Sequence, residues 1–146
     1  MVIRADEFPN LRASSYKIKS PESRDYNCIA WAAGDVTAWW WPDFLETVYW
    51  PPGVPREETL EAFIQAYRTL GYEPCQDTSF EQGFEKVALY SLTDGEMTHA
   101  ARQLDNGRWT SKLGPLEDIE HENPEDVNGP VYGSVICVLR RSRRVS

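Results

Sequence analysis

The segment VALYSLTDGEMTHAARQLDNGRWTSKLG, residues 87–114, decides the fold that we predict for this chain of 146 residues. Residues 87–92 are a short apolar run bounded by a turn, which is typical of a buried strand. Residues 97–104 alternate as a strand does, and residues 108–114 follow as a third strand. The Asp-Gly and Asn-Gly pairs between these runs favour hairpin turns. The segment therefore predicts an antiparallel meander.

Outward from this meander, VYGSVICVLR at residues 131–140 predicts a closing fourth strand. Two helices are expected before the meander, at residues 28–33 and 57–70, and each is followed by a glycine that favours a helix end. Asp25 or Asn27 can cap the first helix by accepting backbone N–H bonds.

Helices followed by an antiparallel meander predict one α+β domain over residues 1–146, with the N-terminal helices packed on one face of the sheet. Residues 1–24 are polar and carry two prolines, so they are expected to be irregular. The basic run RRSRR, residues 140–144, is interpreted as a solvated tail.

Composition excludes several classes of function. The net charge of −8 argues against nucleic acid as the main partner. No apolar run approaches the roughly 18–20 residues that span a bilayer, and the N-terminus has no signal-like apolar core, so we expect a cytoplasmic protein without a membrane partner. The three cysteines are far apart and form no cluster with histidine, so neither a metal nor another cofactor is expected.

Cys28 is the residue that most directly suggests chemistry. It lies in YNCIAWAAGD, after two polar residues and at the start of the first predicted helix. The positive end of a helix dipole favours thiolate over thiol, and the thiolate is the nucleophile. A structural interpretation suits the other two cysteines better: Cys137 lies inside an apolar strand, and Cys75 has no helix or base near it in the sequence.

His99 is the candidate general base. It lies in MTHAARQL, on a predicted strand, where it shares a face with Ala101 and Gln103. Imidazole near its ordinary pKa suits proton transfer at neutral pH, provided that it lies within about 3 Å of the nucleophile. A hydrogen-bonded histidine at a sheet surface, with no chemical role, is the competing interpretation.

The third catalytic position stays open in the sequence. A three-residue turn at 105–107 places Ser111 on the His99 side of the sheet, and we take Ser111 as the third candidate. A two-residue turn would place its neighbours there instead, because a shift of one residue reverses every side chain. The other candidates are Thr110, Lys112, Asp118 and His121.

Substrate-binding residues are expected around the helix start and in the aromatic stretch between Trp31 and Trp50. The Cys28 backbone N–H, with the amide of Asn27, would hold an oxyanion, although Asn27 can equally serve as the helix cap. Trp31, Trp41 and Trp50 are candidates for a groove wall. Aromatic clusters also fill cores, and for this stretch we favour that interpretation.

Six motifs distributed over most of the chain are distinctive together: YNCIAWA, WWWP, YWP, EKVALY, THAARQLDNGRWTSKLG and VYG. On these motifs the chain resembles a family of uncharacterised bacterial domains, a domain of unknown function. The resemblance implies a cysteine at a helix start and a histidine on a strand, in a layout similar to papain-like and NlpC-type cysteine peptidases. Cys28 and His99 match this layout, whereas the usual Asn, Asp, His or Gln at the third position is missing.

We therefore expect a cysteine-dependent hydrolase or acyltransferase, thiol-protease-like, that acts on a peptide or amide bond, in a peptide or a protein, through Cys28 and His99. The alternative is a catalytically inactive binding or regulatory module, of the immunity type, on the same fold. Geometry separates the two: an enzyme needs the Cys28 sulfur beside a His99 ring nitrogen in an open cleft.

Overall fold

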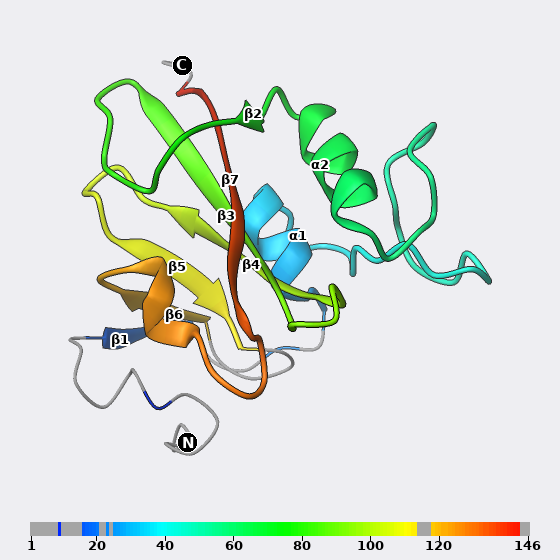
Figure 1. The fold of residues 1–146 in the computed structure, drawn as a ribbon, viewed down its shortest axis with the longest axis horizontal. Coiled ribbons are helices and arrows are strands. Elements are labelled where there is room, and N and C mark those ends of the chain that lie inside the picture. The colour runs from blue at the N-terminus through cyan, green and yellow to red at the C-terminus, as the bar shows by residue number, and fades with distance from the viewer. Residues whose placement is uncertain (1–8, 10–15, 21–22, 24, 114–117, 144–146) are drawn as a thin grey trace.

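A seven-stranded sheet dominates the protein, whose structure is a computed structural model that describes residues 9, 16–20, 23, 25–113 and 118–143 (Figure 1). The strand order is β1-β6-β5-β4-β3-β7-β2, and every neighbouring pair is antiparallel. The strands are β1 Tyr16–Ser20, β2 Glu73–Pro74, β3 Phe84–Ser91, β4 Met97–Gln103, β5 Trp109–Lys112, β6 Asp118–His121 and β7 Ser134–Ser142.

Two short α-helices accompany the sheet in the described part of the chain. Helix α1 spans Cys28–Ala33, as predicted, and ends at Gly34 with φ +86°. Helix α2 spans Leu60–Arg68, inside the predicted range, and Thr59 caps it by accepting the Ala62 N–H. A short 3₁₀-helix, η2, covers Pro124–Val127.

The core has two parts. The first contains α1, α2 and the aromatic segment between them, packed against side chains of β3, β4 and β7 such as Leu89, Ala100 and Leu139. The second contains side chains of β3, β4, β5 and β6 together with Val127 and Tyr132. Because Ala100 belongs to the first part and Ala101 to the second, the alternation along β4 assigns its side chains to opposite faces.

The predicted papain-like or NlpC-type α+β fold is wrong. The described chain is mostly antiparallel sheet, and its two α-helices contain only six and nine residues. Strand β1 comes before both helices, in a stretch that we expected to be irregular, and β2 comes after them. A two-residue strand such as β2 leaves no hydrophobic pattern in a sequence, and its pairing with β7 comes from tertiary contact.

Strand β6 also lies outside the predicted strands, because its sequence DIEH is polar and has no strand-like apolar pattern. All four of its residues are buried. Their polar groups are paired across the sheet: Asp118 lies 3.8 Å from the Lys112 ammonium, and Glu120 forms a 2.7 Å ion pair with Arg108. Polarity signals a loop only where the polar groups face water, and here they face each other.

The solvated tail predicted for residues 140–144 is wrong over its described part. Arg140 and Arg141 belong to β7. The Arg141 guanidinium lies 2.5 Å from Glu85, and Arg140 pairs with Glu81. The arginines therefore fasten the end of β7 to β3 and to the loop before it.

Gly133 tests how closely the backbone just before β7 approaches the end of β3. Its φ is +74°, and a Cβ there would lie 2.0 Å from the Ser91 carbonyl oxygen. We expect Gly133→Ala to lower the free energy of unfolding by about 4 kcal/mol or more. Gly53→Ala is the matched control, because φ is +83° and the space is open, and it should cost only about 1–2 kcal/mol. Urea unfolding measures both, and equal losses would contradict the close approach.

Candidate functional site

Asn27 builds the start of α1. Its side-chain oxygen accepts the Ala30 N–H at 3.1 Å, which caps the helix, and also the Trp40 N–H at 3.0 Å. Its side-chain nitrogen donates to the Trp40 carbonyl at 2.8 Å. Asn27 therefore joins the helix to the following loop, and these structural bonds occupy its carbonyl oxygen and one of its N–H groups.

Cys28 is the first residue of α1 and is 7% exposed. Its thiol contacts the Thr98 carbonyl oxygen at 3.8 Å. Burial raises the pKa of this thiol to about 11, although the backbone N–H groups of Ala100, Ile29 and Cys28 and the charge of Lys112 act in the opposite direction. The helix start thus favours the thiolate, as expected, but desolvation has the larger effect, and Cys28 is a thiol at neutral pH.

The space that Cys28 occupies arises where two strands separate. Strand β4 pairs with β5 at Arg102 and Gln103 only. Before this point no residue that the structure describes pairs with the edge of β4 on the β5 side, and α1 packs against both strands. The sulfur lies against the backbone of Thr98 and Ala100 on this edge.

His99 is buried on the other side of the strand. Its ring stacks on Tyr132, with ring centroids 3.9 Å apart and planes 9° apart, and meets the edge of Tyr90 at 5.0 Å. Both partners belong to the second part of the core, whereas Cys28 belongs to the first. Among the described residues neither ring nitrogen has a hydrogen-bond partner, so no contact of the kind an enzyme needs links His99 to the thiol. Burial, with a smaller effect of His121, holds the pKa of His99 well below its usual value.

Ser111 shares the His99 side of the sheet but has another partner. The hairpin turn at Asp105–Gly107 contains three residues, since Leu104 N–H donates to Arg108. Ser111 Oγ lies 2.8 Å from His121 Nε2, and His121 Nδ1 lies 2.8 Å from the Asn123 carbonyl. Both side chains are fully buried, so they form an internal hydrogen-bonded pair rather than a third catalytic group for Cys28.

Three of the other candidates for the third position contact side chains of α1 or of the segment just before it. Thr110 accepts the Trp31 indole N–H at 3.0 Å. The Asp118 carboxylate accepts the Tyr26 hydroxyl at 2.5 Å, and the Lys112 ammonium lies 4.6 Å from the centre of the Tyr26 ring. Burial and this hydrogen bond raise the pKa of Tyr26 to about 12. Lys112, not His99, is the side chain whose charge lowers the pKa of the Cys28 thiol.

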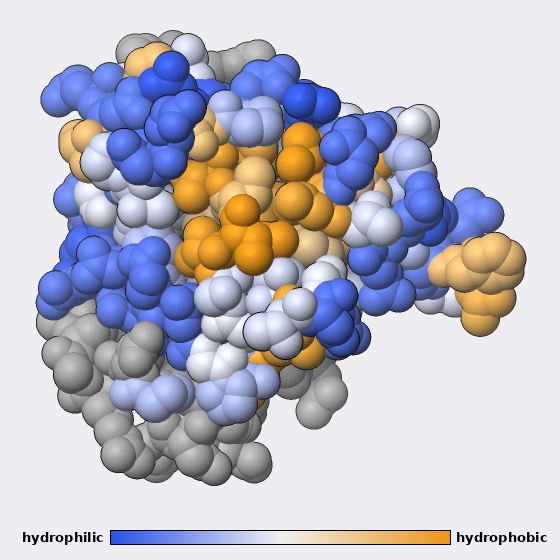
Figure 2. Space-filling model, viewed as in Figure 1, coloured by the Kyte–Doolittle hydropathy of each residue, from blue (hydrophilic) through white to orange (hydrophobic). Residues whose placement is uncertain are grey.

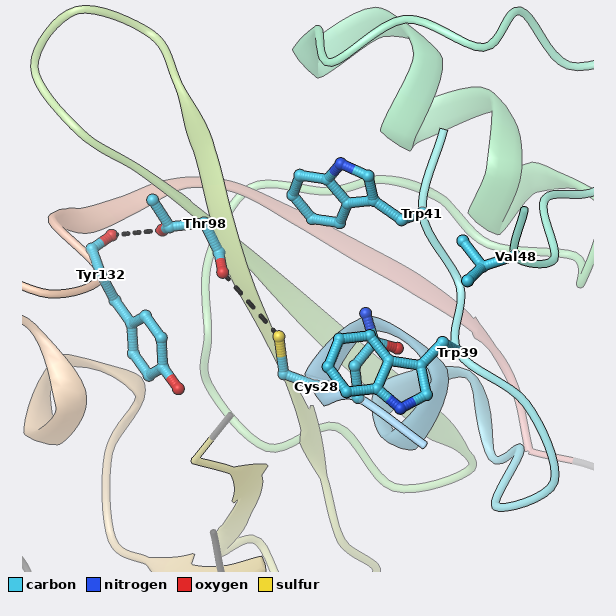
Figure 3. Close-up of a pocket in the computed structure, with 7 residues that line it drawn as sticks. Cys28, Trp39, Trp41, Val48, Thr98 and Tyr132 are labelled. Carbon is cyan, nitrogen blue, oxygen red and sulfur yellow. Dashed lines mark hydrogen bonds between the residues drawn. The ribbon is translucent and has the colours of Figure 1, made fainter. Parts of the chain in front are cut away.

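A pocket of about 420 Å³ opens beside the thiol (Figure 3). One wall comes from the loop after α1, and the other comes from β4 and the segment before β7, with Cys28 between them. The lining residues are Asn27, Cys28, Trp39, Trp41, Val48, Thr98 and Tyr132.

Sequence reasoning identified three of these seven positions. Asn27, Cys28 and Trp41 line the pocket, whereas the candidates Trp31 and Trp50 do not. Trp31 stacks on Tyr26, and Trp50 is buried against Phe63. The missed residues Trp39 and Val48 lie in the same aromatic stretch as Trp41, but Thr98 and Tyr132 reach the pocket only through the sheet topology.

No group of three or more His, Cys, Asp or Glu side chains in the described part of the chain could hold a metal ion. Within the same residues, no helix has the length and apolar character needed to cross a membrane. The fold and site thus define an antiparallel sheet domain with an apolar pocket beside a buried thiol.

The comparison with family models matches residues 17–140 to a domain of unknown function, DUF7689. Because the match covers most of the chain, the protein belongs to this family, which confirms the expected membership of an uncharacterised domain family. Neither the curated proteins nor the solved structures contain a match.

The reactivity of Cys28 follows from its pKa. With a pKa of about 11, on the order of one molecule in a thousand carries the thiolate at pH 8. We expect iodoacetamide to modify Cys28 in the native protein at least about tenfold more slowly than the partly exposed Cys75 at this pH. Peptide mass spectrometry at increasing pH measures the rates, and faster labelling of Cys28 would contradict the raised pKa.

The stability of the protein should fall in acid because of His99. Its pKa is lowered by folding, so below the unfolded value of about 6.5 the unfolded chain binds the proton more readily. From about pH 6.5 downward, wild type should lose up to about 1.4 kcal/mol per pH unit more than His99→Phe, which keeps a ring against Tyr132. Urea unfolding at several pH values tests this, and equal slopes for the two proteins would refute it.

Proposed function

We propose that this domain is a binding module whose pocket beside Cys28 holds an apolar or aromatic group of a peptide or protein partner. The observation that carries the proposal is the pocket itself, about 420 Å³ in volume and lined mainly by aromatic and aliphatic side chains. Its volume and lining are typical of ligand sites, which are mostly apolar with a few polar groups that orient the ligand. The Cys28 thiol and Thr98 are such polar groups.

The wall formed by the loop is held in place before any ligand arrives. The Asn27 side chain accepts the Trp40 backbone N–H and donates to the Trp40 carbonyl. The Trp40 indole N–H donates to Asp35 at 2.8 Å. The Trp41 N–H donates to the Tyr49 carbonyl at 3.0 Å, which closes the loop on itself. A preformed pocket spends less binding free energy on ordering, so a small apolar group suffices for measurable affinity.

Cysteine-dependent hydrolysis is the second candidate. In its favour, the thiol faces the pocket and the charge of Lys112 and three backbone N–H groups favour its thiolate. Against it, burial keeps the thiol protonated, and His99 is sealed behind Tyr132 without a contact to the sulfur. A binding module needs neither a charged thiol nor a base, so it fits the observed site without any rearrangement of Cys28 or His99.

Titration with indole, followed by protein NMR, tests the binding module. We expect saturable shifts at the pocket residues, and Trp39→Ala should weaken the affinity at least about tenfold, since it removes one wall. Phe80→Ala is the control, because Phe80 is an exposed aromatic residue outside the pocket. Absence of saturable binding, or equal affinity of wild type and Trp39→Ala, would show that the pocket is not a binding site.

An esterase assay distinguishes a cysteine-dependent hydrolase from a binding module. With p-nitrophenyl acetate, a hydrolase that uses Cys28 gives acyl-enzyme turnover that Cys28→Ala abolishes. A binding module gives only slow acylation that continues at the other cysteines.

A further inference from the structure

The loop that forms one wall of the pocket also carries the most exposed large apolar side chains among the described residues. We call residues 35–56 the aromatic loop. Phe44 is 89% exposed and Leu45 is 78% exposed. In Figure 1 the aromatic loop extends away from the sheet, and in Figure 2 it ends in an apolar projection at the right-hand edge of the molecule. We call Phe44 and Leu45 the tip.

The structure holds the tip in a defined conformation. The Asp43 carboxylate accepts the Thr47 backbone N–H at 2.7 Å and the Thr47 hydroxyl at 2.5 Å, so it closes the turn across the tip. It also forms a 2.9 Å ion pair with Arg56 at the base of the loop. Glu46 has a φ of +55°, which is uncommon for a residue other than glycine. Two large apolar side chains are thus presented to solvent by a turn with specific bonds.

The charges around the tip permit its burial against another apolar surface. The Arg56 guanidinium lies 2.9 Å from the Asp43 carboxylate and 3.9 Å from that of Glu46, so both acidic residues beside the tip have a cationic partner. The net charge of the chain is −8, so two copies repel each other at long range. A contact between copies must therefore rest on apolar burial and should strengthen as salt screens the repulsion.

We propose that a second copy of this chain is the partner, and that its Phe44–Leu45 tip enters the pocket beside Cys28. This rests on the proposed function, whose ligand it identifies. The aromatic loop carries both halves of the contact, because Trp41 and Val48 line the pocket a few residues before and after the tip. Two aromatic loops related by a two-fold axis insert both tips at the same time, which gives a closed, isologous dimer.

The area of such a contact places it in a size class of interfaces. A Phe side chain buries roughly 150–250 Å². Each contact also buries Leu45 and the pocket surface that faces the tip, and the dimer contains two such contacts. The total buried surface then approaches roughly 1,200 Å², the low end of specific interfaces. We therefore expect a dimer with a dissociation constant in the micromolar range, on the order of 10 µM.

Sedimentation velocity tests the proposal at concentrations from about 1 to 300 µM, which bracket the expected dissociation constant. Wild type should form a dimer that tightens with salt. The double variant Phe44→Ser, Leu45→Ser and the variant Trp39→Ala should each be monomeric, while Phe80→Ser, at another exposed aromatic residue, should dimerise like wild type. Because the tip is exposed, its variant should remain folded, which circular dichroism checks.

Mixing the two deficient variants shows whether the contact is reciprocal. The tip variant keeps its pocket and Trp39→Ala keeps its tip, so their mixture should regain a weaker heterodimer. A wild type that stays monomeric at 300 µM overturns the proposal, as does a dimer that ignores both variants. The proposal is also overturned if the chain stays monomeric and its tip binds a different protein.

Failure of this proposal is distinguishable from failure of the proposed function. The tip variant has an empty pocket, so it should bind indole at least as tightly as wild type. Saturable indole binding without dimerisation keeps the binding module and removes the second copy as its partner. Absence of saturable indole binding in both the wild type and the tip variant removes the binding module itself.

Discussion

The side-chain amide of Asn27 is the contact on which the pocket depends. It makes three hydrogen bonds, one to the first turn of α1 and two to the backbone of Trp40. A helix of six residues is not stable by itself, so α1 needs this cap and its burial against the sheet. The same amide orients the aromatic loop relative to Cys28, and the two features that define the pocket therefore share one anchor.

The separation of β4 from β5 is the second structural condition for the site. Where the two strands pair, at Arg102 and Gln103, β5 occupies the edge of β4. Beyond these pairs, the Cys28 sulfur lies against the backbone of Thr98 and Ala100, and Tyr132 lines the same pocket from the other part of the core. The pocket is thus a consequence of sheet geometry, and its chemical character comes from the aromatic residues that cover it.

The alternation of side chains along β4 accounts for the largest difference between the expected and the observed site. A cysteine at a helix start and a histidine on a strand suggested a catalytic pair. The strand directs Ala100 toward the helices, whereas the ring of His99 packs between Tyr90 and Tyr132 in the second part of the core. Without knowledge of which face the helix covers, a sequence pattern cannot tell whether two such residues meet.

The sequence by itself determined the local elements whose signals are strong: the strands of the central meander, helix α1 with its cap and glycine end, the core of α2, and the position of Cys28 at a helix start. It also indicated Asn27 and Trp41 at the pocket. Only the tertiary structure decided the rest. Strands β1, β2 and β6 exist because a neighbouring strand pairs their backbone or polar groups, and Thr98 and Tyr132 line the pocket because the sheet brings distant segments together. Hydrophobic periodicity records which residues are buried within one element, and contacts between elements leave no such record in the sequence.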